Sequence, residues 1–465
     1  MANSVEDYRE HLSTLDEAGN RKWIYPKKPK GKYHTWRAIV AVLLLTFLFG
    51  APFIKINGNP LLQFDVIERK FSILGNMFFP QDFHIFMFAM IVGIIFIGVF
   101  TLIFGRIFCG WVCPQTIFME MIFRKIEYFI EGDWTKQKQL NRAPWTASKI
   151  FKKTAKHLIF FIISFFISNI FLAYVIGSDD LLKIMSEPPS QHIVGLIAII
   201  IFSFLFYGVF AFMREQVCTN ICPYGRLQSV LLDKYSIVVA YDHKRGESRG
   251  KFRKNEDRAT VNKGDCIDCK QCINVCPTGI DIRNGTQLEC VNCTACIDVC
   301  DDMMANVGLP GGLIRYASEH NIETGSKFKF TKRLMGFSTL LIVLTVIFIA
   351  LLTVRGKLEA TIMRTPGMLY SEPIEGKYSN LYNYSIANKT SNLLSVQFKL
   401  ESTGGTVQMI GQQNLNLDRE QITEGSFFIH LDKNTVTSSE NTVVIGVYAG
   451  DEKVQEVSTS FLGPK

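Results

Sequence analysis

The sequence predicts a multi-domain membrane protein with five transmembrane helices, a cysteine-rich segment on one side of the membrane and an all-β sandwich at the C-terminus. Three observations predict this fold class. Five apolar stretches are long enough to cross a bilayer, all 12 cysteines lie between Cys109 and Cys300, and short alternating runs follow Gly356. Hydrophobic residues make up 48% of the chain and charged residues 20%. That balance excludes disordered, collagen-like and coiled-coil proteins.

The predicted spans are five stretches without Asp, Glu, Lys or Arg, because a transmembrane helix needs about 20 mostly apolar residues. The first stretch is the shortest and has Pro52 near its end. It follows a polar, basic tail and no A-x-A site comes after it, so we do not expect a cleavable signal peptide. Bounded by flanking charges, the stretches run from Arg37 to Lys55, Phe83 to Arg106, Lys156 to Asp179, Glu187 to Arg214, and Arg333 to Arg355.

The basic residues predict the orientation of these spans. The segments 1–37, 105–157 and 214–333 hold 36 of the 50 Lys and Arg residues. The short loops differ most, with ten basic residues in 105–157 and one in 177–191. By the positive-inside rule, the N-terminus and the cysteine-rich segment are cytoplasmic and the C-terminal segment is outside. The net charge of +8 therefore reflects membrane topology, and we expect no nucleic-acid partner.

Eight cysteines form two runs with the spacing of bacterial two-cluster ferredoxins. In that pattern three thiolates of one run and the last cysteine of the other bind one [4Fe–4S] cubane. The expected ligands of one cluster are Cys266, Cys269, Cys272 and Cys300. The expected ligands of the second cluster are Cys290, Cys293, Cys296 and Cys276. Zinc sites usually use separated C-x2-C pairs, and the cytoplasm would reduce disulfides.

The second run ends in Asp301, at the position where Pro277 follows the first run. Two more carboxylates, those of Asp298 and Asp302, lie close by in the sequence. Negative charge disfavours an added electron, so we expect this acidic group to lower the potential of the adjacent cluster.

The remaining four cysteines form two copies of a C-x3-C-P motif at the predicted cytoplasmic ends of spans two and four. Proline suits the first position of a helix, so each motif is expected to precede one, over Gln115–Ile130 and Tyr224–Asp233. Cys113 and Cys222 would then lie near helix N-termini, where a thiol becomes more acidic. Arg106 and Arg214 would act in the same direction. The four candidate catalytic and metal-binding residues are Cys109, Cys113, Cys218 and Cys222.

Three roles are open for these four cysteines, which could meet if spans two and four pack together. They bind a soft metal ion such as Cu(I), they cycle between dithiol and disulfide, or they are buried structural cysteines. Duplication of the whole motif favours the first two roles. Metal binding is favoured over a disulfide because thiolate coordination of Cu(I) needs no strained geometry.

A polar stripe marks the helix after the first motif. Glu120, Arg124, Glu127 and Glu131 recur at helical spacing, opposite apolar residues that include Phe118 and Phe129. This pattern predicts an amphipathic helix on the membrane surface, and the alternative is a solvated helix packed on soluble neighbours.

The C-terminal segment reads as an antiparallel sandwich. Val396 and Phe398 alternate with Gln397 and Lys399, as one buried face requires. Its ten basic and 12 acidic residues include no cysteine, so partner docking or passive stabilisation is its expected role. The predicted strands are Tyr378–Ala387, Leu393–Glu401, Thr406–Ile410, Ser426–Leu431, Thr442–Ala449 and Lys453–Phe461.

Taken along the chain, these assignments predict five regions. They are a cytoplasmic tail over 1–37, a four-helix membrane region over 38–235, a cytoplasmic dicluster ferredoxin-like domain over 236–333, a fifth transmembrane helix over 334–354 and an outer domain over 355–465.

Three stretches carry a resemblance to a known family: Phe108–Thr116 (FCGWVCPQT), Cys276–Gly285 (CPTGIDIRNG) and Gly312–Tyr316 (GLIRY). Together with the two motifs and the two cysteine runs, they resemble the cytochrome c oxidase accessory family CcoG, also called FixG or RdxA. The likeness extends from about Tyr33 to the C-terminus. It implies a bacterial inner-membrane protein with an immunoglobulin-like periplasmic domain. It also implies a role in assembly of cbb3-type oxidases, with reduction of Cu(II) to Cu(I) for copper chaperones or exporters.

Two other functions stay open. One is a respiratory quinol-linked electron-transfer subunit, which would use the clusters differently, as in membrane proteins similar to the quinol-oxidising subunits of nitrate and nitrous oxide reduction. The other is a non-catalytic assembly scaffold, which would not need the clusters. His84 and His192 begin spans two and four and could hold a haem, although interfacial histidines are usually polar anchors. The sequence shows no nucleotide fingerprint, so electrons are expected from an unidentified cytoplasmic donor or a quinol. The oligomeric state is open.

Overall fold

The computed structural model describes residues 14, 18 and 20–464, apart from 57, 67–69, 254–257, 259, 327, 328, 375, 391, 403 and 412–414. Most of the predicted tail before residue 20 therefore lies outside the described residues. The chain forms two compact units, and each is described by itself. One unit comprises residues 1–52 and 89–346, and the other comprises residues 53–88 and 347–465.

Among the residues that the structure describes, five helices are long and apolar enough to cross a membrane, as predicted. Two begin earlier in the chain than the flanking charges indicated. The first contains Arg37, whose buried side chain donates from Nε to the Gly110 carbonyl at 3.0 Å. The third begins after Thr146, whose hydroxyl caps it by accepting from the Lys149 amide. The helices are α2 (Lys32–Gly50), α3 (Phe83–Phe104), α8 (Ala147–Ile176), α10 (Ile193–Gly208) with its extension η4 (Val209–Met213), and α16 (Lys332–Thr353).

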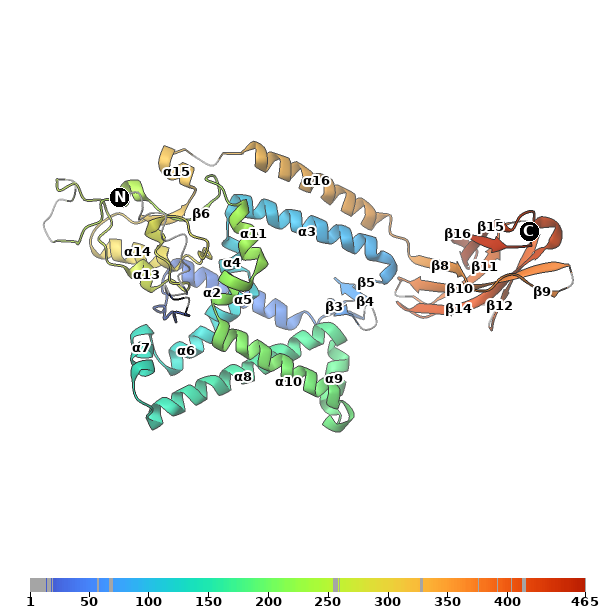
Figure 1. Ribbon diagram of the computed structural model, residues 1–465, viewed down its shortest axis with the longest axis horizontal. Helices are drawn as coiled ribbons and strands as arrows, with labels where there is room; N and C mark the ends of the chain where they lie inside the picture. The colour runs from blue at the N-terminus through green and yellow to red at the C-terminus, as the bar shows by residue number, and fades with distance from the viewer. Residues whose placement is uncertain are drawn as a thin grey trace. The chain divides into compact units, whose positions relative to one another are not determined.

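Two helix pairs organise the membrane part of the first unit. α8 and α10 lie side by side and are joined by α9 (Ser178–Ser186) and η3 (Pro189–Gln191) (Figure 1). Phe123 stacks on Phe210 at 4.7 Å between ring centroids and meets Phe160 edge-on at 4.9 Å, which fills the space between these helices. α3 packs against α16 through Leu102 and Leu334.

Both helices predicted after the C-x3-C-P motifs are present, and each begins at its proline. The first is interrupted by a π-helical turn, a feature that occurs frequently at functional sites. Its parts are α5 (Pro114–Ile117), η2 (Phe118–Phe123) and α6 (Arg124–Ile130). α4 (Ile107–Trp111) precedes it and α7 (Trp134–Arg142) follows it. The second motif lies in η5 (Val217–Ile221) and precedes α11 (Pro223–Leu231).

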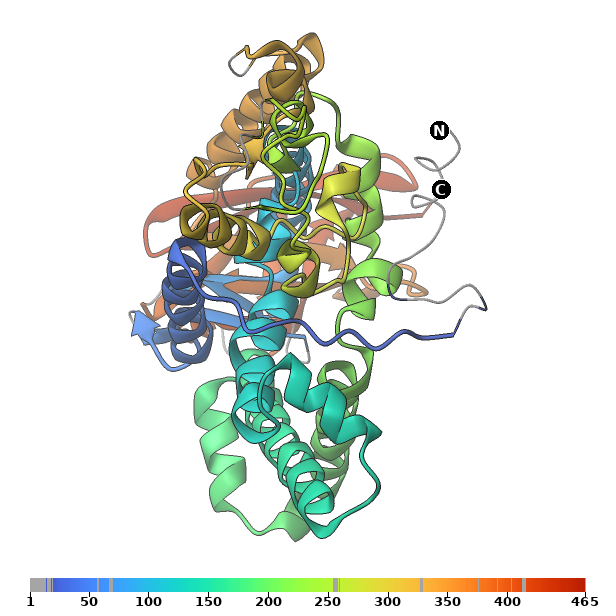
Figure 2. The same cartoon turned by 90° about the vertical axis from the view of Figure 1, so that its left-hand side faces the viewer.

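The cysteine-rich segment is closed by two short antiparallel strands, β6 (Val238–Tyr241) and β7 (Ile314–Ala317). They bring the two ends of the segment together, so the cysteine loops form between them (Figure 2). Between the strands lie α12 (His243–Gly246), α13 (Gln271–Asn274), η6 (Ile282–Asn284) and α14 (Ala295–Asn306). α15 (Glu319–Thr324) follows β7.

The second unit contains a small β region that the sequence analysis did not predict. β3 (Leu62–Asp65), β4 (Lys70–Ile73) and β5 (Asn76–Phe78) form an antiparallel sheet beside the pair β1 (Lys55–Ile56) and β2 (Asn59–Pro60). Asp82, at the end of η1 (Pro80–Asp82), forms ion pairs with Lys389 at 2.6 Å and with Arg355 at 2.8 Å. Burial acts to raise the pKa of Asp82, but the hydrogen bonds and charges of Arg355 and Lys389 outweigh it and lower that pKa.

The C-terminal sandwich is the other part of this unit, and all six predicted strands are present in it. One sheet has the order β12–β14–β10–β8, with β9 beside β10, and the other has the order β13–β11–β15–β16. Three strands were not predicted: β8 (Leu358–Arg364), β9 (Ser371–Ile374) and β13 (Leu415–Leu417). The others are β10 (Lys377–Asn388), β11 (Leu394–Leu400), β12 (Gly405–Met409), β14 (Ile422–Asp432), β15 (Glu440–Ala449) and β16 (Glu452–Leu462).

The core of the sandwich follows the predicted alternation. Val396 is buried, Phe398 packs against the same core, and Gln397 and Lys399 are exposed. Phe427 fills the centre, with its ring 5.0 Å from that of Phe398. The antiparallel sandwich prediction is therefore confirmed.

Candidate metal centres

The two cysteine runs share one backbone pattern. In the first run Asp268 and Lys270 have φ of 51° and 55°, and in the second Asn292 and Thr294 have φ of 51° and 64°. These left-handed residues occupy the same positions after Cys266 and after Cys290, and each loop then enters a helix. Left-handed non-glycine residues are uncommon and cluster at functional sites.

The first cavity, which we call site one, is lined by cysteines from both runs. About 400 Å³ in it is free of protein atoms, part of it open to solvent, and Tyr241 and Arg283 contribute to its wall. Burial raises the pKa of Cys272 and Cys300 to about 12, while Arg283 opposes the shift at Cys272. Its cysteines are Cys266, Cys269, Cys272 and Cys300.

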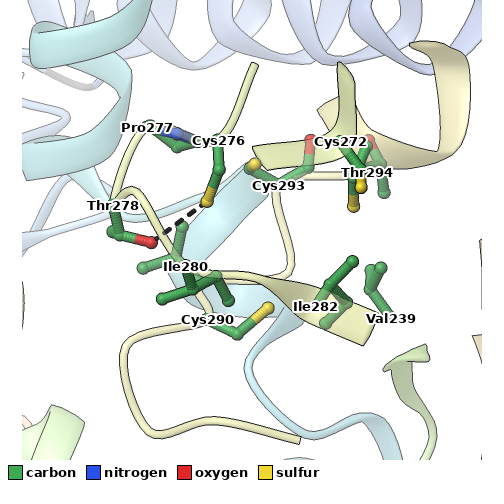
Figure 3. A pocket seen from close by; sticks show the side chains of 12 residues that line it. Val239, Cys272, Cys276, Pro277, Thr278, Ile280, Ile282, Cys290, Cys293 and Thr294 are labelled. Atoms are coloured by element: carbon green, nitrogen blue, oxygen red, sulfur yellow. Dashed lines mark hydrogen bonds between the residues drawn. The ribbon is translucent and has the colours of Figure 1, made fainter. Parts of the chain in front are cut away.

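The second cavity, site two, has about 350 Å³ free of protein atoms, part of it open to solvent. Figure 3 shows the side chains that line it. The Cys276 sulfur lies 3.4 Å from the Thr278 hydroxyl, which the dashed line in Figure 3 marks. Burial raises the pKa of Cys290 to about 12 and that of Cys293 to about 11. Cys272 lines both cavities, so the two sites adjoin. The other cysteines of site two are Cys276, Cys290, Cys293 and Cys296.

These linings suit a cubane. Each cavity offers four thiols from the expected set, and apolar side chains such as Val239 and Ile280 fill the rest of the wall of site two. In the part of the chain that the structure describes, no three His, Cys, Asp or Glu side chains are close enough to bind a single metal ion. A cubane needs a wider spacing, because each thiolate binds a different iron corner.

The two C-x3-C-P motifs come together, and we call their cysteines the four-thiol group: Cys109, Cys113, Cys218 and Cys222. Cys113 and Cys222 are the N-caps of α5 and α11, as the proline positions predicted. The charges of Cys113 and Cys222 influence both Cys109 and Cys218, and the charge of Cys109 also influences Cys218. The motifs therefore converge from two separate helix junctions.

At Cys109 and Cys218, the two members of this group that do not cap a helix, burial outweighs the nearby arginine. Burial raises the pKa of Cys109 to about 11 and that of Cys218 to about 12, and the opposing effect of Arg106 is smaller. Arg106 and the Cys109 thiol both donate to Gln228 Oε1, at 2.8 and 3.2 Å. Arg214 points elsewhere, because it pairs with Glu127 at 2.8 Å.

The four-thiol group lies against site two. Cys109 and Cys218 share one apolar cluster with Cys293 and Cys296. The Trp111 indole donates to the Tyr316 hydroxyl at 3.1 Å, which in turn lies 3.5 Å from the Asn292 carbonyl in the site-two loop. Helix α4 and the second cysteine run are thus in direct contact.

The polar stripe of η2 and α6 is buried, so the prediction of a surface helix is wrong. Arg124 and Glu127 are 1% and 3% exposed. Glu127 pairs with Arg214 at 2.8 Å and with Lys156 at 3.4 Å. A stripe facing solvent would have left these cations of η4 and α8 without their partners, which explains why it turns inward. The remaining pairs of this ion network are Arg124–Glu120, Arg124–Glu215, Arg214–Glu215, Lys156–Glu131, Lys153–Glu131 and Arg21–Glu215.

The carboxylates near the second run have structural partners. Asp298 is buried and accepts from the amides of Tyr33 and His34, at 3.0 and 2.8 Å, so it caps α2 from another element. Asp301 accepts from the Gly312 amide at 2.7 Å. The lowered cluster potential that we expect from these carboxylates stays a prediction.

Three family models match the chain. A model described as "4Fe-4S dicluster domain" matches residues 213–319, which contain both cysteine runs and the second C-x3-C-P motif. A "4Fe-4S binding domain" model matches residues 86–138, which contain the first motif. A model described as "IG-like fold at C-terminal of FixG" matches residues 348–464.

Curated relatives agree with these matches. Protein RdxA of Cereibacter sphaeroides is 31% identical over 82% of this chain and 83% of its own length. Protein RdxB of the same organism is 30% identical over 82% of both chains. The chain belongs to the FixG/RdxA family. Nitrogen fixation protein FixG of Rhizobium meliloti is 34% identical over 64% of this chain and 57% of the relative.

Membership of the FixG/RdxA family confirms several predictions. The iron–sulfur character of the cysteine runs and the immunoglobulin-like fold of the C-terminal region are both borne out. With five apolar helices in its described part, the chain is a membrane iron–sulfur electron-transfer protein.

Sequence reasoning missed Gly110 and Gln228, which contact the site without carrying its chemistry. Gln228 is fully buried beside Cys109. Its position on α11, in the turn after Cys222-Pro223, was the available signal. Two of the interfacial histidines have ordinary partners: His157 Nδ1 lies 2.8 Å from the Tyr207 hydroxyl, and His192 Nε2 lies 2.5 Å from Glu187 Oε2.

Proposed function

We propose that this protein supplies electrons for assembly of a cbb3-type cytochrome c oxidase by reducing Cu(II) to Cu(I) in the cytoplasm. Its partners are then a cytoplasmic electron donor, a copper chaperone or exporter, and oxidase assembly factors. Copper is the substrate in this reaction, and the iron–sulfur clusters are the resident cofactors. When bound, these clusters accept and release single electrons.

The observation that supports this proposal is the four-thiol group beside site two. An electron-delivering site and a group of soft ligands adjoin each other, as reduction of a soft metal ion requires. As they stand, the thiols of Cys109, Cys113, Cys218 and Cys222 are not close enough to bind one ion together. The proposal therefore requires them to draw together around the copper ion, which they retain as Cu(I) because thiolates favour the reduced ion.

The crossed ligand assignment is part of the proposal. Site one and site two each bring cysteines of both runs into one cavity. Cys266, Cys269, Cys272 and Cys300 hold one cubane, and Cys276, Cys290, Cys293 and Cys296 hold the other. Each buried thiol binds iron as a thiolate, so loading a cubane releases protons.

Stopped-flow mixing tests the reaction. Anaerobically purified protein is reduced, freed of reductant and mixed with Cu(II) in the presence of a Cu(I) chelator. We expect the cluster absorbance to return to that of the oxidised form as the Cu(I) chelate appears. The variant with all four thiols replaced by Ser should lose copper binding and Cu(I) formation while keeping about eight irons.

Two outcomes contradict the proposal. If Cu(II) leaves the reduced wild type unchanged while a quinone analogue oxidises it rapidly, the chain is a quinol-linked subunit. If the four-Ser variant forms Cu(I) at the wild-type rate, the clusters reduce copper without the thiols. A scaffold would show neither oxidation, and its assembly role would survive loss of iron.

The orientation is a separate proposal that rests on the basic-residue distribution, with 18 Lys and Arg in 214–333. It places the tail, the cysteine runs and the four-thiol group in the cytoplasm and the sandwich in the periplasm of a bacterial inner membrane. Reporter fusions after Ile130, at Leu181 and at the C-terminus should read inside, outside and outside. Cytoplasmic activity from the C-terminal fusion would overturn it.

A further inference from the structure

Sites one and two differ in their access to solvent. Cys269 of site one is exposed, and so is its neighbour Lys270. Among the eight cysteines of the two runs, all of which the structure describes, Cys269 is the exposed one. A soluble electron donor can therefore approach site one most closely at Cys269.

Site two is covered by other parts of the chain. An extended segment precedes α2 and crosses the front of the first unit in the view of Figure 2. The Lys27 amide donates to the Asn274 carbonyl at 2.7 Å, which ties this segment to the first cysteine run. A Cβ atom on Gly279, in the loop after Cys276, would lie 3.0 Å from Ile24 Cδ1. Ile24 therefore packs directly over the site-two loop.

The remaining side of site two faces the four-thiol group, and Gly110 forms the contact. Gly110 lies in the first C-x3-C-P motif and is buried. A Cβ atom at this position would lie 2.5 Å from the Val291 carbonyl oxygen and 2.8 Å from that of Asn292. Both oxygens belong to the backbone between Cys290 and Cys293, which would have to move to accept a side chain.

We propose that electrons pass in a fixed order, entering at site one through the Cys269 edge and leaving from site two to the four-thiol group, with Gly110 as the residue that positions this exit. The inference rests on the proposed function. A reduced soluble one-electron carrier is oxidised at the entry, and one Cu(II) ion becomes Cu(I) at the exit. One electron is transferred for each ion, and no covalent bond to a substrate forms or breaks.

The test measures the two half-reactions separately on the full-length protein. Photoreduced FMN, an anionic donor, reduces the oxidised protein, and Cu(II) oxidises the reduced protein. In Gly110→Ala we expect an unchanged rate with FMN and oxidation by Cu(II) slowed about tenfold, since small displacements of reacting groups are costly. Gly98→Ala is the matched control, because a Cβ atom there meets nothing within 4 Å. It should change neither rate.

Charge reversal at the entry should slow the other half-reaction, the reduction of the protein. In Lys270→Glu we expect reduction by FMN to slow about tenfold at low ionic strength, while oxidation by Cu(II) keeps its rate. Lys399→Glu, on an exposed position of the sandwich, controls for net charge. A Lys270→Glu rate with FMN equal to that of the control would overturn the entry assignment.

A spectroscopic measurement covers the case in which Gly110→Ala fails to fold. Thr278→Val removes the hydroxyl that lies 3.4 Å from the Cys276 sulfur, so it should shift the potential of one cluster only. Co(II), a paramagnetic ion added to the reduced wild type, should broaden the EPR signal of that same cluster. It should broaden no signal in the four-Ser variant.

The outcomes separate this inference from the function on which it rests. Broadening of the other cluster, or of neither, overturns the placement of site two at the exit. Wild-type rates in a folded Gly110→Ala variant overturn the positioning role, even when copper is reduced. If the wild type itself does not reduce Cu(II), the proposed function fails and the exit step fails with it.

Discussion

In the C-terminal sandwich, β10 and β14 pair along most of their length, and apolar side chains from both sheets close the core. The cysteine-rich segment has instead β6 and β7 of four residues each, and helix α13 of four residues. Cysteines occupy much of its interior, in contact with Tyr241, Ile280 and Leu313. The interior of the sandwich is therefore apolar, whereas that of the cysteine-rich segment consists largely of cysteines.

This difference predicts what each region needs in order to fold. The sandwich gains its stability from apolar burial, which requires no cofactor. The loops of sites one and two have little regular structure, and their thiols surround two cavities that apolar side chains do not fill. Metal binding supplies folding free energy in segments of this kind.

Removal of iron should have the largest effect and should separate the two regions. We expect chelation under oxidising conditions to abolish protection of β6, β7 and α14 from amide hydrogen exchange. The strands of the sandwich should keep their protection, because their core contains no cysteine. Mass spectrometry of the full chain before and after chelation measures both regions at once. Equal loss in both regions would show that the sandwich depends on the clusters.

A substitution in the core of the sandwich tests whether the sandwich can be destabilised without loss of iron. Phe427 is fully buried between the two sheets. Phe427→Ala should cost about 3–5 kcal/mol, through lost transfer free energy and the cavity that remains. Hydrogen exchange of β10 and β14 measures the loss. Iron content should stay at the wild-type value, and a parallel loss of iron would mean that the two regions fold as one.

The sequence predicted both of these regions but misassigned the buried ion network, for physical reasons. Cysteine spacing specifies a cluster motif by itself, and alternation in Val396–Leu400 specifies a buried strand face, so both were found. The ion network was misassigned because periodicity shows that Glu127 and Phe129 lie on different faces but not which face is buried. Phe129 is in fact 91% exposed and Glu127 is 3% exposed.

The contacts of Gly110 and Asp298 could not be predicted for another reason. Gly110 meets the backbone of Val291, and Asp298 caps a helix more than two hundred residues earlier in the chain. Such contacts depend on how distant elements dock, which local sequence patterns do not encode. Sequence therefore located the reactive groups, while the residues that position them required the structure.

The buried ion network is a third kind of interior and should respond to pH. Burial opposes ionisation of Glu127, but Arg214 and Lys156 outweigh it and lower its pKa to about 2. A carboxyl with a lowered folded-state pKa stabilises the protein above its unfolded pKa, near 4.5. This contribution should be lost as the pH falls from about 4.5 toward 2.

Glu127→Gln should therefore destabilise the protein at neutral pH by about 3 kcal/mol, because two buried cations lose a partner. The estimate lies at the low end of the usual range, since Lys156 keeps Glu131 and Arg214 keeps Glu215. Thermal unfolding in detergent at pH 7 and at acidic pH measures the effect. The difference in unfolding temperature between the variant and the wild type should be smaller at acidic pH than at pH 7. An equal difference at the two pH values would contradict the charge explanation.

The smallest expected effect concerns Asp298, which joins the cysteine-rich segment to the first span. Its carboxylate accepts from the first amides of α2, so Asp298→Ala should cost about 1 kcal/mol, as the loss of a helix cap usually does. Asp302 is exposed and lies on the same helix, which makes Asp302→Ala the matched control. Hydrogen exchange of the first turn of α2 should rise in Asp298→Ala and stay unchanged in the control. Both variants could instead shift a cluster potential equally and leave the exchange of α2 unchanged. In that case these carboxylates act on the clusters through their charge, and the cap contributes little to holding the two elements together.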